Sequence, residues 1–141
     1  MRKRTKAREL ALQSIYQFDL RGDEVGPDVD DLLARATEDA EVLDFARKLI
    51  EGTRLKRAEI DKAIEGAARN WEMRRMAAID RNILRLATYE LLYREDIPPL
   101  VTINEAIDIA KKFSTKNSGP FVNGILDTIR LRAAPPGKQK K

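Results

Sequence analysis

The amino-acid sequence predicts an all-α protein. Apolar residues recur at offsets of three and four through nearly the whole chain, and no stretch shows the sustained alternation that a half-buried strand requires. With 43% hydrophobic and 35% charged residues, the chain has enough apolar surface to fold. A length of 141 residues suits one domain, which we expect at 1–133, followed by a disordered basic tail at 134–141.

Turn and capping signals divide the chain into its helices. Gly22 ends the first helix, Asp28 is placed to cap the second, and the two prolines at 98 and 99 break the fifth. Thr102 and Glu105 form a capping-box pattern that predicts the start of the sixth helix, and Ser118 precedes a proline-containing first turn of the seventh. We therefore expect seven helices, at about 5–20, 28–36, 39–53, 56–69, 76–93, 102–113 and 118–132.

Composition argues against most catalytic and metal-binding classes. The chain has no cysteine and no histidine, which removes disulfides, thiolate nucleophiles, imidazole bases and Cys/His zinc sites. It also has no Gly-rich phosphate loop and no nucleophile motif. Glu90 falls within the apolar arc of the fifth helix, where a hydrogen-bonded structural role is the preferred interpretation. We expect no catalytic residue, metal or cofactor.

No apolar run reaches the length of a membrane span, and the first 20 residues lack the uncharged stretch of a signal peptide. We therefore expect a cytoplasmic protein. Its charge is unevenly placed, because residues 1–8 hold five basic and no acidic groups: Arg2, Lys3, Arg4, Lys6 and Arg8. Such a cluster at a helix tip favours contact with nucleic-acid phosphates, with a solvated terminus as the alternative interpretation.

Three further features are candidates for binding. The turn from Lys116 to Pro120 precedes a helix whose first amides attract anions, and Phe121 lies beside it, either to meet a base or to edge the core. Tyr16 faces away from the apolar centre of the first helix, so it suits either a partner interface or plain surface. Asp80 raises the same choice.

Four ordered segments resemble the bacterial transcription antitermination family NusB, and the resemblance extends from about residue 5 to 131. The segments are ARELALQSIYQ at 7–17, IDRNILRLATYEL at 79–91, VTINEAIDIAKKF at 101–113 and SGPFVNGILD at 118–127. The resemblance implies two packed three-helix subdomains and no enzymatic activity. It also implies binding of boxA RNA in ribosomal RNA leader transcripts with NusE, a small-subunit ribosomal protein, and assembly with NusA, NusG and RNA polymerase.

The resemblance also assigns roles to individual residues. This chain departs from the family's common pattern at Thr5, where an arginine is frequent, and at Asn117, where an acidic residue is frequent. The positions implied for RNA binding are Lys3, Arg4, Thr5, Lys6, Arg8, Gln13, Lys116, Ser118 and Phe121, and those implied for NusE are Tyr16, Asp80, Phe113 and Asn117.

Other interpretations remain open on the sequence alone. Ribosomal RNA cytosine methyltransferases carry a similar helical domain, but this chain has no cofactor loop and no catalytic cysteine. A purely structural, protein-binding domain is a third interpretation, and the chain suits either a monomer or a homodimer. In the leading interpretation, the basic start of the first helix and the amino end of the last helix lie close together and jointly hold one strand of RNA.

Overall fold

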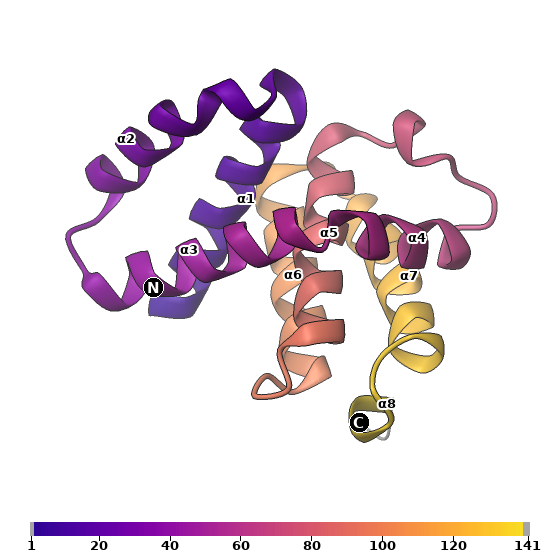
Figure 1. The fold of residues 1–141 in the computed structure, drawn as a ribbon. Helices are drawn as coiled ribbons and strands as arrows, with labels where there is room; N and C mark the ends of the chain where they lie inside the picture. Colours follow the sequence, from indigo (N-terminus) through magenta and orange to yellow (C-terminus); the bar gives the residue numbers. More distant parts are fainter. Residues whose placement is uncertain (1, 140–141) are drawn as a thin grey trace. The chain divides into compact units, whose positions relative to one another are not determined.

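The computed structural model describes residues 2–139, and it contains helices and no strand over that range (Figure 1). This confirms the predicted all-α class. The helices form two compact units, Met1–Leu55 and Lys56–Lys141. Within residues 2–139, every helix is too short or too polar to cross a bilayer.

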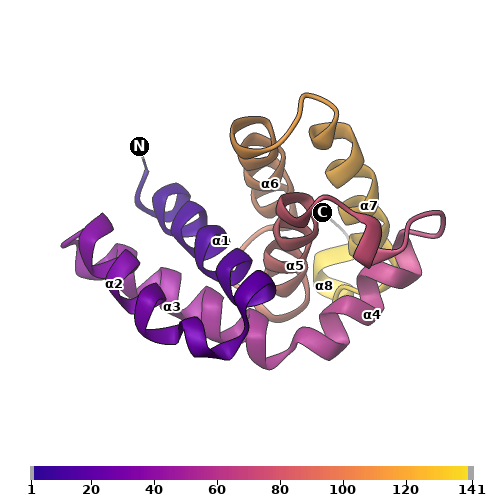
Figure 2. The ribbon, with the colours of Figure 1, turned by 90° about the horizontal axis from the view of Figure 1, so that it is seen from above.

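The first unit contains three α-helices and one short 3-10 helix. They are α1 (Lys3–Arg21), η1 (Asp23–Val25), α2 (Gly26–Ala36) and α3 (Ala40–Leu55). Gly22 has a φ of 84°, a conformation that suits glycine, and its amide donates to the Phe18 carbonyl at the end of α1. The core forms mainly where α1 packs along α3 (Figure 2). Its largest fully buried side chains are Leu12 on α1, Leu33 on α2 and Leu49 on α3.

The two remaining helix starts of this unit have different capping. Asp39 caps α3, because its Oδ1 accepts hydrogen bonds from the amides of Glu41 at 2.9 Å and Val42 at 3.4 Å. The predicted cap at Asp28 is wrong, since α2 already begins at Gly26 and no side chain caps it. The Asp28 carboxylate instead pairs with Arg21 at 2.8 Å.

The second unit is built around α5 (Ala78–Tyr93). This helix contacts three neighbours, as its wide apolar arc predicts, and Leu84 and Leu91 are fully buried on it (Figure 1). Arg85 on α5 donates to both carboxylate oxygens of Asp61 on α4, at 2.8 and 3.2 Å. The other elements are α4 (Arg57–Ala67), η2 (Met73–Arg75), α6 (Pro99–Phe113), α7 (Ser118–Arg132) and α8 (Pro136–Gln139), so this unit holds four long helices where three were expected.

The predicted capping box is wrong. Helix α6 begins three residues earlier, at Pro99, because proline suits the first helical position and Pro98 before it is extended. Thr102 therefore lies inside the helix. Its hydroxyl is buried and donates to Glu90 Oε1 at 2.8 Å, which gives that buried carboxylate the structural hydrogen bond expected for it.

Residues after 133 pack against the second unit, whereas a disordered tail was predicted there. Ala134 is buried, and the Lys138 ammonium donates to the carbonyls of Glu90 at 2.7 Å and Arg94 at 2.6 Å. These carbonyls belong to the end of α5, where an amine satisfies acceptors that the helix leaves open. Burial lowers the pKa of Lys138. Lys140 and Lys141, part of the predicted tail, lie outside the described residues.

Candidate nucleic-acid interface

The start of α1 concentrates positive charge where a helix least favours it. Lys3, Arg4 and Lys6 occupy its first four positions, and the first turn contains no acidic residue. The amino end of a helix dipole is itself positive, so cations there destabilise the helix. An anion bound at this end would offset the positive charge of these side chains and that of the helix dipole.

Lys3 shares its charge with the protein's own carboxylates. Its ammonium lies 3.1 Å from Asp39 Oδ2 and 3.5 Å from Glu41 Oε1, at the start of α3. The hydrogen bond with Asp39 raises the pKa of Lys3, and the same bond lowers the pKa of Asp39. Part of the predicted basic surface is therefore neutralised within the first unit.

Arg4 and Arg8 both contact the ring of Phe45 on α3. The Arg4 guanidinium carbon lies 4.4 Å from the ring centroid, and that of Arg8 lies 5.5 Å from it. Arg8 is only 4% exposed, whereas Arg4 is exposed. Phe45 thus fixes one guanidinium at the surface and a second inside the unit.

Three more predicted residues lie along α1. Thr5, Gln13 and Tyr16 are each half-buried. Gln13 and Tyr16 are three positions apart and share one helix face, so the exposed parts of their side chains lie side by side. Leu12 and Ile15 next to them in the chain are buried, so this face borders the core of the unit.

The turn before α7 is held by a cluster of hydroxyls and one carboxylate. Ser118 is buried, its hydroxyl donates to Asp80 Oδ2 at 3.0 Å, and it also lies within hydrogen-bond distance of Ser114 and Thr115. The predicted capping role of Ser118 is wrong, since this residue begins the helix and its hydroxyl bonds to α5 instead. No side chain caps α7.

The residues around this buried cluster are more accessible. Lys116 and Asn117 are exposed, and Phe113 at the end of α6 is half-buried with the Lys112 ammonium 5.4 Å from its ring centroid. Asp80 itself is buried, and its Oδ1 has no hydrogen-bond partner among the described residues. The second unit therefore presents Phe113, Lys116 and Asn117 outward and keeps Asp80 beneath them.

Phe121 contacts an aromatic residue that the sequence interpretation did not select. Its half-buried ring meets Trp71 edge to face, with centroids 5.3 Å apart and planes at 79°. Trp71 is 55% exposed in the loop between α4 and η2. The signal available in the sequence was an aromatic residue in a polar loop, but spacing alone cannot show that residues 50 positions apart are neighbours.

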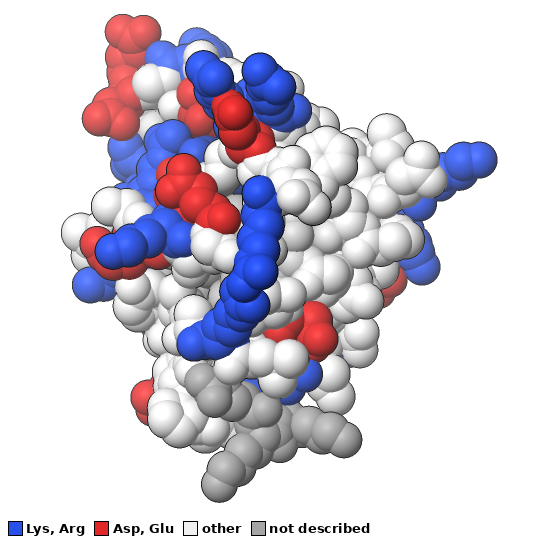
Figure 3. All heavy atoms as spheres, turned by 90° about the vertical axis from the view of Figure 1, so that its right-hand side faces the viewer, with Lys and Arg blue, Asp and Glu red and all other residues white. Residues whose placement is uncertain are grey.

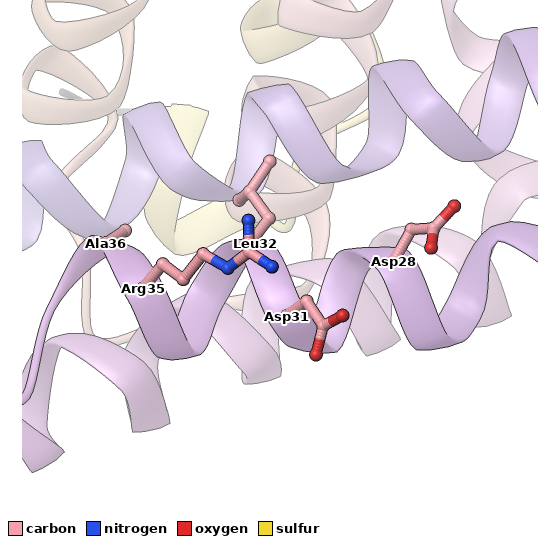
Figure 4. Close-up of a pocket in the computed structure, with 5 residues that line it drawn as sticks. All are labelled: Asp28, Asp31, Leu32, Arg35 and Ala36. Carbon is pink, nitrogen blue, oxygen red and sulfur yellow. The ribbon is translucent and has the colours of Figure 1, made fainter.

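Mixed charge covers the face in Figure 3, and the hollow on α2 has a mainly acidic lining. Acidic and basic side chains are interspersed with broad uncharged areas on the face in Figure 3. A hollow on α2 is lined by two carboxylates, one guanidinium and two apolar side chains, all from that helix: Asp28, Asp31, Leu32, Arg35 and Ala36 (Figure 4). Its acidic lining is unsuited to phosphate. Residues 2–139 hold no cluster of three potential metal ligands.

The sequence pattern of the NusB family matches residues 5–130. The chain belongs to the NusB family. It is 50% identical to the transcription antitermination protein NusB of Geobacter sulfurreducens over 89% of this chain and 92% of that protein. The NusB family consists of antitermination factors without enzymatic activity.

Solved NusB structures share the fold. The T. maritima NusB structure is 40% identical with a TM-score of 0.85, and the alignment covers 98% of this chain and 97% of that one. A structure of the antitermination factors NusB and NusE in complex with double-stranded RNA is 30% identical with a TM-score of 0.83, covering 92% of this chain and 96% of that one. The expected NusB-like fold is thereby confirmed.

Proposed function

We propose that this chain binds the boxA element of nascent ribosomal RNA leader transcripts together with NusE, and that this binding suppresses transcription termination in the cytoplasm. The observation that carries the proposal is the first turn of α1, where three cations and no acidic residue occupy the positive end of the helix dipole. Family membership supports the same function.

The first turn of α1 supplies the contacts with RNA phosphates in this proposal. Neutralising phosphates with lysine and arginine releases counterions, which is a main source of nucleic-acid affinity. Arg4 is the principal contact, because Phe45 holds its guanidinium at 4.4 Å while the side chain remains exposed. Lys6 and Lys116 add charge. Thr5, Gln13 and Phe121 contact the RNA from half-buried positions, and the buried Arg8 and Ser118 keep their neighbours in place.

NusE is the proposed protein partner. A relative that is 30% identical was solved as a complex of NusB and NusE with RNA. On this chain, Tyr16 in the first unit and Phe113 and Asn117 in the second offer the mixture of aromatic and polar surface common in interfaces. Asp80 supports the turn beneath Asn117 through Ser118. We further propose that NusA, NusG and RNA polymerase complete the antitermination complex.

The test is a titration of the purified chain with boxA RNA and with a scrambled strand of equal length, each with and without NusE. We expect boxA to bind more tightly than the scrambled strand, and NusE to widen the difference. A duplex form of boxA serves as a third ligand, because unpaired bases can be read where paired ones cannot. Equal weak binding of all three ligands, with and without NusE, would refute the proposal.

A further inference from the structure

Trp71 is a large aromatic side chain that the fold leaves mostly uncovered. It is 55% exposed, although burial of so large an apolar side chain would stabilise the fold. Its backbone amide donates to the Ala68 carbonyl at 3.0 Å, so the loop places it through a defined turn. Trp71 is also the only tryptophan of the chain.

The ring of Trp71 is oriented by Phe121. The two planes meet at 79°, so one ring presents its edge to the face of the other and keeps both of its own faces clear of its partner. Phe121 lies in the first turn of α7, after the exposed Pro120 and close in sequence to the exposed Lys116. The pair thus combines exposed aromatic surface with the amino end of a helix.

The loop that carries Trp71 is positively charged. Residues 69–75 contain three arginines and one acidic residue, Glu72. Arg74 pairs with Glu72 at 2.7 Å and Arg75 approaches the same oxygen at 3.9 Å, while both arginine side chains stay about three-quarters exposed, at 78% and 74%. One carboxylate cannot neutralise both arginines, and Arg69 is exposed as well. Exposed aromatic rings among surplus cations are typical of surfaces that bind single-stranded nucleic acid.

We propose that Trp71, oriented edge to face by Phe121, forms a platform on which an unpaired RNA base stacks, while the neighbouring arginines attract the adjoining phosphates. This inference rests on the proposed RNA-binding function and adds Trp71 to the residues that contact RNA. The occupant we propose is RNA rather than an apolar protein surface. An RNA strand offers a base that stacks on the ring and a phosphate that the positive loop attracts, so both features act on the same ligand.

The single tryptophan allows a direct test in the native chain. Unlabelled single-stranded boxA RNA is added while the tryptophan emission is recorded, and binding is measured separately by the anisotropy of labelled RNA. We expect the emission to be quenched along the same curve as binding. Trp71→Leu should weaken binding by about fivefold or more, whereas Trp71→Phe, which keeps an aromatic face, should retain most of the affinity. Leu131→Ala removes another exposed apolar side chain from the same unit and should change nothing.

The outcomes separate this inference from the proposed function. If RNA binds but the emission stays constant and Trp71→Leu binds as tightly as the native chain, the platform is refuted and the proposed function stands. If no RNA binds, both fail. A response of the emission to NusE alone, with none to RNA, would assign Trp71 to a protein interface and overturn the inference. Circular dichroism of Trp71→Leu shows whether the variant is folded, and Trp71→Phe gives a second reading if it is not.

Discussion

The cations at the start of α1 differ in how far the protein already uses their charge. Lys3 lies within 3.1 Å and 3.5 Å of two carboxylates, whereas the guanidinium of Arg4 rests on the ring of Phe45. Arg8 is buried. We therefore expect these residues to contribute unequally to phosphate binding, and the contribution of Lys3 is limited by its ion pairs with Asp39 and Glu41.

Asp39→Asn should strengthen RNA binding. Asparagine caps helices about as well as aspartate, so the bonds from Glu41 and Val42 to Oδ1 are retained, while the negative charge facing Lys3 is lost. We expect binding about threefold tighter at low salt, since Lys3 then becomes available to phosphate. The measurement is an RNA titration at 50 mM salt.

Asp30→Asn is the matched control, because it removes an equal charge from the same unit at a residue paired with Arg47. Weaker or unchanged binding in Asp39→Asn, or an equal gain in both variants, would contradict the role of Lys3.

The ion pair of Asp39 also makes the stability of the fold depend on pH. The hydrogen bond with Lys3 lowers the pKa of Asp39, so the contribution of the pair to folding is complete above the ordinary value of 3.8 and is lost as the pH falls through the lowered value.

Between elements, one buried hydrogen bond links α5 to the first turn of α6. Thr102 and Glu90 are both almost fully buried, and their 2.8 Å bond gives the carboxylate a donor away from solvent. A buried acceptor that loses its donor costs more than the bond itself contributes, because it cannot regain its bond with water. The start of α6 is therefore fixed by a contact with another helix.

Thr102→Val should destabilise the protein by about 1–3 kcal/mol, because valine keeps the shape of threonine but removes the donor to Glu90. Chemical unfolding followed by circular dichroism measures the effect. Thr128→Val is the matched control, since the Thr128 hydroxyl donates only to the Gly124 carbonyl within its own helix at 3.1 Å. The control should change stability by less than about 0.5 kcal/mol. Equal effects would show that the bond to Glu90 adds nothing.

Helical periodicity predicted the seven long helices closely, whereas the chemistry of their ends was predicted less well. The capping-box pattern at Thr102 is a local signal, but the hydroxyl is taken by Glu90, twelve residues earlier. Ser118 has a local capping signal too, and Asp80 takes its hydroxyl. Both errors have the same cause. The capping pattern assumes that the hydroxyl bonds to an amide of its own helix, whereas in the fold it bonds to a carboxylate on another helix.

The net charge of a unit does not follow the charge of its basic surface. The unit with the basic tip, Met1–Leu55, carries ten basic and twelve acidic residues, whereas Lys56–Lys141 carries seventeen and eleven. The first unit is thus net negative despite its cationic first turn. At physiological salt, exposed charges act over about 8 Å, so an RNA strand meets the local surface rather than the net charge.

Salt dependence tests this local charge. If Lys3, Arg4, Lys6 and Lys116 contact phosphates of single-stranded RNA, the logarithm of the binding constant should fall with the logarithm of salt concentration with a slope of about −3. Arg4→Ala should make the slope about 0.7 shallower. Arg35→Ala removes an equal charge beside the acidic hollow on α2 and should leave the slope unchanged. A slope near zero, or equal effects of the two variants, would contradict local phosphate contact.

The sequence predicted the basic tip and the exposed turn before α7, but not the aromatic pair or the buried state of Arg8, Asp80 and Ser118. Charge clusters can be read from neighbouring residues in the chain. By contrast, the contact between Trp71 and Phe121 joins a loop to a helix far along the chain. Burial of a charged or polar residue likewise depends on distant partners, as Phe45 shows for Arg8. Such features follow from tertiary packing alone.

The stacking of Arg4 on Phe45 links the interior of the first unit to ligand recognition. A long arginine side chain normally loses conformational entropy when it is immobilised on a ligand, at a cost of up to about 2 kcal/mol. Here the ring restricts the guanidinium before any ligand arrives. Preorganisation of this kind mainly lengthens the lifetime of a complex, so a substitution at the buried Phe45 would shorten the residence time of RNA although no atom of residue 45 touched the strand.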